Sequence, residues 1–210
     1  MNKKFYDEQF QARLRTPGVW ALSARRLRRA AEIIFDHYGK DLRDMEAGVS
    51  PVELENLEIS GCGTLLYGLA VENILKGILL STSQDAIDHG KLRKWPGGGH
   101  DLVLLAAEAK ITLSVTEEDI LKRLSACVRW AGRYPIPKKS EKMGLSQCAY
   151  PSGDSLPMPL EVFEQAAFDA MYIRFESLIL VRSKSNTKAG NGAATATHPA
   201  EGAHSPDVQV

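Results

Sequence analysis

The stretch GCGTLLYGLAVENILKGILL, residues 61–80, decides the fold of this chain because it is the strongest apolar run in the sequence. Its length is close to that of a membrane span. However, Glu72, Asn73 and Lys76 lie in its second half, where polar groups would be costly in lipid. We therefore expect the central helix of a soluble bundle, capped by Ser60 and surrounded by other helices.

The spacing of apolar residues predicts four more helices around this one. The first is expected at about residues 17–38, with Thr16 as its cap, Pro17 in its first turn and Gly39 just after its end. The other three are expected at about residues 100–109, 116–131 and 159–182. Thr116 and Asp119 have the spacing of a capping box at the start of the helix expected at about residues 116–131.

The segments between the predicted helices are rich in turn-forming or acidic residues. Residues 40–59 are acidic and predict a connector with at most a short helix, whereas residues 132–159 hold five prolines and three glycines and predict a long loop. Residues 183–210 lack the apolar side chains that would repay ordering, which predicts a disordered tail. The sequence thus predicts an all-α bundle of about five helices over residues 1–182.

The composition fits one well-packed domain, with 210 residues of which 44% are hydrophobic and 25% charged. The three cysteines, Cys62, Cys127 and Cys148, suggest neither a disulfide framework nor a metal clip, and the N-terminus does not resemble a secretory signal. We therefore expect a cytoplasmic protein with no membrane association, no metal and no cofactor. Cys62, which lies between two glycines, is expected to be a small buried residue rather than a reactive thiol.

Charge is segregated along the chain, although 26 basic residues balance 26 acidic ones. The segment from Arg13 to Arg29 holds six arginines and no acidic residue. The segment 122–142 holds seven basic residues and one acidic residue. Trp130 and Tyr134 lie inside the second block, and basic residues beside aromatic rings suit phosphates and unstacked bases. The same pattern also fits a solvated helix face with a basic loop, or self-association.

Two polar motifs stand out against the apolar background. Glu72 and Lys76 are one helical turn apart and can pair, either as part of a polar seam through the core or, as we favour, as a salt bridge that faces solvent or fixes helix register. His100 follows three glycines at a predicted helix start. Its imidazole could serve as an acid, base or ligand, or could cap the helix and pack under the loop.

Three segments, AVENILKGILL (70–80), GHDLVLLA (99–106) and RWAGRYP (129–135), occur in this order. Together they resemble the HEPN superfamily, small helical-bundle proteins associated with nucleotide and RNA biology. The resemblance spans about residues 17–182. It implies a homodimer that binds nucleotide or RNA without strong catalysis. The site residues that it implies are a polar seam of Glu72, Lys76, His100 and Asp101, with Arg129, Arg133 and Tyr134 contacting phosphate and base.

Many HEPN proteins also carry an arginine and a histidine separated by four to six residues, which form a metal-independent ribonuclease site in the dimer. Arg93 and His100 match this spacing. The residues between them include a tryptophan, a proline and three glycines, which is typical of a loop and favours a binding member of the family. Two alternatives stay open: an endoribonuclease of toxin or defence type that uses Arg93 and His100, and an interaction module that pairs with a nucleotidyltransferase-type or defence-system partner.

Overall fold

The structure is a computed structural model that describes residues 3–14, 16–50, 59–82, 87–88, 91–131 and 164–192. Its helices are α1 (Lys3–Leu14), α2 (Pro17–Glu46), α3 (Ser60–Thr82), α4 (Leu102–Glu108), α5 (Val115–Ala126) and α7 (Gln165–Gly192). A π-helix, Cys127–Ala131, extends α5, and a short 3₁₀ helix covers Pro96–Gly99. Two-residue strands, β1 (Ile87–Asp88) and β2 (Lys91–Leu92), form a small antiparallel ladder. The predicted all-α bundle is confirmed.

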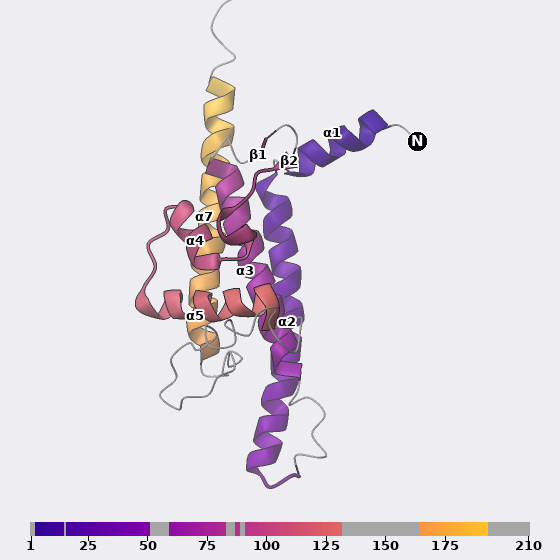
Figure 1. The fold of residues 1–210 in the computed structure, drawn as a ribbon, viewed down its shortest axis with the longest axis vertical. Coiled ribbons are helices and arrows are strands. Elements are labelled where there is room, and N and C mark those ends of the chain that lie inside the picture. Colours follow the sequence, from indigo (N-terminus) through magenta and orange to yellow (C-terminus); the bar gives the residue numbers. More distant parts are fainter. Residues whose placement is uncertain are drawn as a thin grey trace, which may run out of the picture.

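The long helices α2, α3 and α7 run side by side, and α5 crosses them (Figure 1). The helix α3 is the centre of the core, since side chains on almost every side of it are fully buried, among them Tyr67, Val71, Ile74 and Leu75. In length and hydropathy α3 could cross a membrane, but 67% of its most apolar window is buried inside the protein. This burial agrees with the prediction of a central bundle helix.

Glycines on α3 let neighbouring helices approach closely. A Cβ atom added at Gly68 would lie 2.5 Å from Val128 Cγ2, and one at Gly77 would lie 2.3 Å from Ile179 Cδ1. Both distances are shorter than any real packing contact, so these positions require glycine. The close approach at Gly68 sets the position of the helix end that carries Arg129.

The helix α2 is longer than predicted. Gly39 is a buried residue within it, and the helix ends at Glu46, so the predictions of a helix end at Gly39 and of a connector from residue 40 are wrong for 40–46. Gly48, with φ +94°, is the left-handed residue that follows the helix. Its N–H donates to the Met45 carbonyl, and the Val49 N–H donates to the Asp44 carbonyl, which satisfies the free carbonyls of the last turn. Residues 51–58 lie outside the described residues.

Two helix starts also differ from the prediction. The capping box of α5 uses Ser114 and Glu117 in place of Thr116 and Asp119, because the helix begins at Val115. Each of the two side chains bonds the backbone N–H of the other residue. The helix α3 begins at Ser60 itself, so this serine is not its N-cap.

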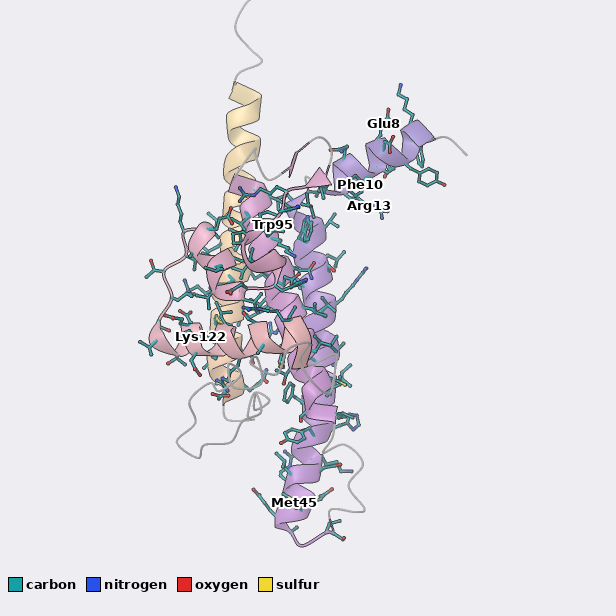
Figure 2. The ribbon with its side chains drawn as sticks, in the orientation of Figure 1. Glu8, Phe10, Arg13, Met45, Trp95 and Lys122 are labelled. Carbon is teal, nitrogen blue, oxygen red and sulfur yellow. The ribbon has the colours of Figure 1, made fainter. Side chains whose placement is uncertain are left out.

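The N-terminal helix α1 was not predicted, because its residues show no helical stripe of apolar side chains. It projects from one end of the bundle, and Glu8 and Phe10 stand away from the other helices (Figures 1 and 2). Only Leu14 is buried, whereas Phe5, Tyr6 and Phe10 are each about half exposed (53%, 51% and 50%).

The last helix, α7, continues to Gly192, so the prediction that the tail begins at residue 183 is wrong for 183–192. Once a helix exists, each further residue adds a backbone hydrogen bond, and no apolar face is needed for this extension. Residues 193–210 and the predicted loop 132–159 lie outside the described residues. Cys62 is exposed, in contrast to the expectation that it is buried.

Candidate polar site

The carboxylate of Glu72 connects two basic side chains at the middle of α3. Its Oε1 accepts a hydrogen bond from Lys76 Nζ at 2.6 Å, and its Oε2 lies 2.9 Å from His100 Nδ1. The Glu72 and Lys76 side chains are only 9% and 13% exposed. The pair therefore does not face solvent. It belongs to a polar seam that reaches from α3 to the segment before α4, which is the reading we did not favour from the sequence alone.

The segment Pro96–Gly99 lies against this seam. Its three glycines all have left-handed backbone angles, with φ of +61°, +73° and +82°. A Cβ atom at Gly99 would lie 3.2 Å from Lys76 Nζ and 3.2 Å from Trp95 Cδ1. Glycine at position 99 therefore brings the backbone against both the ammonium group and the indole ring.

Asp101 joins the seam to the end of α5. Its Oδ1 accepts the backbone N–H of Leu104 at 3.1 Å and so caps α4. Its Oδ2 accepts a hydrogen bond from the Arg129 guanidinium at 2.7 Å. Arg129 belongs to the π-helix Cys127–Ala131, a rare element that occurs often at functional sites.

The structure thus brings together residues from all three segments that carried the resemblance. We call Glu72, Lys76, His100, Asp101 and Arg129 the polar cluster. The solvent-facing members are His100 and Arg129, whose side chains are 39% and 44% exposed. Arg133 and Tyr134, the other predicted phosphate and base contacts, lie outside the described residues.

Arg93, the predicted catalytic partner of His100, is held by other groups. Its guanidinium forms an ion pair with Glu108 of α4 and lies 5.0 Å from the centre of the Trp95 ring. Within the described residues, Arg93 and His100 are bonded to different carboxylates and not to each other. This pairing reduces the positive charge that Arg93 could offer to a phosphate.

Several basic residues of the two blocks form ion pairs inside the part of the chain that the structure describes. Arg25 and Arg28 of α2 pair with Glu176 and Asp169 of α7, at 2.5 and 2.8 Å. Arg123, which belongs to the block 122–142, is buried and binds both carboxylate oxygens of Glu164. These contacts explain most of the described charge pattern without a partner.

Sequence reasoning missed Trp95. This residue is 8% exposed, and its Nε1 is buried without a hydrogen-bond partner among the described residues. Figure 2 shows it beside α3, where the segment from β2 meets that helix. The only available signal was its position two residues before the glycine triplet.

The described residues include no group of three His, Cys, Asp or Glu side chains that could hold a metal ion. No match was found when the chain was compared with models of protein families, with curated proteins and with solved structures.

Proposed function

We propose that this protein binds a phosphate group of a nucleotide or of RNA at the polar cluster and does not catalyse strongly. The observation that carries the proposal is the convergence of Glu72, Lys76, His100, Asp101 and Arg129 from segments far apart in the chain. The resemblance to HEPN proteins supplies the class of ligand. A cytoplasmic homodimer is part of the same proposal.

The arrangement of the cluster favours an anion. Glu72, Lys76 and Asp101 are its more buried members, at 9%, 13% and 21% exposure, whereas the side chains of His100 and Arg129 are 39% and 44% exposed. The Arg129 guanidinium therefore faces solvent with N–H donors, and the Asp101 carboxylate holds it from behind. Phosphate oxygens accept charge-assisted hydrogen bonds from such donors, and guanidinium groups suit them best.

The experiment compares the binding of fluorescent single-stranded RNA and of adenosine monophosphate to the full chain and to the Arg129→Ala variant. We expect affinity to fall about 10-fold, as one lost charge-assisted bond predicts, and the salt dependence of RNA binding to become shallower. The control is Lys122→Ala, which removes an exposed basic side chain that pairs with Glu118 on the same helix. Equal loss in both variants, or no binding by the parent protein, contradicts the proposal.

A metal-independent endoribonuclease is the second candidate, because Glu72 holds His100 in one orientation. A carboxylate on Nδ1 leaves Nε2 of the same ring to exchange a proton with a substrate. Arg93 would then stabilise phosphate charge, although it pairs with Glu108 in this structure. RNA cleavage by the parent protein that His100→Ala abolishes would favour this candidate over pure binding.

The third candidate, an interaction module, finds its support in α1, whose half-exposed aromatic side chains could contact another protein. The charge blocks no longer support it strongly, because α2 and α7 already pair within one chain. Co-purification of a protein partner by the full chain, with loss of that partner on deletion of residues 1–14, would favour it.

A further inference from the structure

We propose that one phosphate oxygen of the ligand binds at an inner position between Lys76 Nζ and Trp95 Nε1, next to Gly99. This inference rests on the proposed function and deepens it, because it assigns a specific anion position to Lys76 together with Trp95, a residue that the sequence motifs do not include. The outer position, at His100 and Arg129, would hold the rest of the same ligand.

The first observation is the indole N–H of Trp95. The side chain is 8% exposed, yet its Nε1 has no hydrogen-bond partner among the described residues. A buried donor without an acceptor is costly, and native proteins leave few of them without a ligand or water. Indole nitrogen can only donate, so the missing group is an acceptor.

The second observation is that Lys76 brings more donors to the same place. Lys76 carries three N–H donors and is 13% exposed, and Glu72 Oε1 is its one acceptor within the described residues. Donors on both Lys76 and Trp95 favour a group that only accepts, such as phosphate, over a cation or an amide.

The third observation is the close approach of Lys76 and Trp95 to Gly99. Lys76 Nζ and Trp95 Cδ1, which is bonded to Nε1, each lie 3.2 Å from the point where a Cβ atom would stand. The ammonium group and the indole edge therefore flank the same point, within the span that the oxygens of one tetrahedral phosphate can bridge. Gly97 and Gly98, which precede Gly99, are exposed, and glycine backbones change conformation at little steric cost.

The glycine triplet provides a matched pair of variants. Both Gly98→Ala and Gly99→Ala put a side chain on a left-handed backbone, with φ of +73° and +82°. A Cβ at Gly98 meets nothing within 4 Å, whereas a Cβ at Gly99 presses on Lys76 and Trp95. A difference in binding between the two variants therefore reports occupation of the inner position and not backbone strain.

The test measures by calorimetry how tightly adenosine monophosphate and adenosine bind to the full chain. The same measurement is made on the variants Trp95→Phe, Gly98→Ala and Gly99→Ala. Trp95→Phe keeps an aromatic ring and removes the N–H. We expect affinity for adenosine monophosphate to fall about 10-fold in Trp95→Phe and in Gly99→Ala, and to stay unchanged in Gly98→Ala. Adenosine, which lacks phosphate, should bind weakly to all of them.

The source of the phosphate is distinguished by two RNA oligonucleotides, one with a 5′-phosphate and one with a 5′-hydroxyl. If Trp95→Phe loses affinity only for the 5′-phosphate oligonucleotide, a terminal phosphate occupies the inner position. If Trp95→Phe loses affinity equally for both oligonucleotides, an internal phosphodiester occupies it. Unchanged affinity of Trp95→Phe for every phosphate-containing probe overturns the inference. If Arg129→Ala still weakens binding in that case, the proposed function stands without the inner position. No binding by the parent protein refutes both.

Discussion

Arg123 and Lys76 are both basic side chains inside the bundle, but their surroundings differ. The two terminal nitrogens of Arg123 bind Glu164 at 2.6 and 2.5 Å, and one of them also binds Asp119 at 3.2 Å. Lys76 shares its single described acceptor, Glu72, with His100, and lies beside Gly99 and Trp95. The difference teaches that the number of carboxylates around a buried cation, more than its burial or charge, separates a structural ion pair from a candidate ligand site.

The strongest test of this comparison is Arg123→Ala. This change leaves the Glu164 carboxylate, which is 18% exposed, without its bidentate partner, and it creates a cavity at a side chain that is 2% exposed. We expect the free energy of unfolding to fall by about 3 kcal/mol, as for other broken buried pairs. Urea unfolding followed by circular dichroism measures it, and Lys122→Ala on the same helix should change it by less than about 0.5 kcal/mol. A loss of stability in Arg123→Ala as small as that in Lys122→Ala would contradict the view that Arg123 forms a structural ion pair.

The second test is Gly68→Ala, which acts on packing without changing charge. The added Cβ would meet Val128 Cγ2 at 2.5 Å and the Leu124 carbonyl oxygen at 3.2 Å, so α5 must move away from α3. We expect a loss of about 2 kcal/mol. Gly61→Ala is the control, since its Cβ meets nothing within 4 Å and a helical alanine is favoured over glycine. Thermal unfolding of both variants checks the prediction, and equal melting temperatures would contradict it.

Tyr67 gives a smaller and pH-dependent effect. Burial raises the pKa of its phenol to about 12, although the hydrogen bond from Gln165 Nε2 opposes this rise. Because the folded state holds the proton more tightly, the stabilisation is complete below pH 10.0 and is lost as pH rises toward about 12.

We expect Tyr67→Phe to lower stability by about 1 kcal/mol at neutral pH and to flatten part of this alkaline loss. Burial also raises the pKa of Tyr172, so the Tyr67→Phe variant still loses some stability as pH rises, through this second tyrosine. Urea unfolding on both sides of pH 10.0 measures the slopes, and identical slopes in parent and variant would refute the assignment.

The smallest effect on stability is expected at the polar cluster itself. Arg129 is 44% exposed, so Arg129→Ala should lower the free energy of unfolding by less than about 0.5 kcal/mol. Its binding of phosphate should nonetheless weaken, which is the reverse of the behaviour expected for Arg123→Ala. Parallel unfolding and binding measurements on the two variants sharpen the comparison. A stability loss at Arg129 as large as that at Arg123 would show that Arg129 is structural.

Helical periodicity and the one-turn spacing of Glu72 and Lys76 were enough to predict the all-α bundle and one pair of the polar cluster. Helix ends were harder, because Gly39 and Gly48 are equivalent as sequence signals. Gly39 is buried within α2, and only Gly48 adopts a left-handed angle. Which glycine ends the helix is decided by packing, which the local sequence does not encode.

Among contacts between distant segments, only the seam that joins Glu72 to His100 was expected, and that expectation came from the resemblance and not from residue spacing. Nothing in the sequence pairs Arg93 with Glu108, or the arginines of α2 with the acids of α7. The burial of Arg123 could have been suspected, because it lies three residues after Ile120 and one before Leu124, close to the apolar stripe of α5. Trp95 and Gly99 belong to the inner position only because the segment Pro96–Gly99 packs against Lys76 of α3.

The π-helix at Cys127–Ala131 has a consequence for how this surface can change. A π turn is an α-helix that has accommodated one additional residue, and each residue of an α-helix advances it by about 100°. Removal of one amino acid before Arg129 in this segment would restore ordinary winding and rotate the Arg129 side chain away from Asp101. Loss of a single codon in this short segment is thus a route by which the Arg129 guanidinium could be pointed in another direction while the other helices keep their sequences.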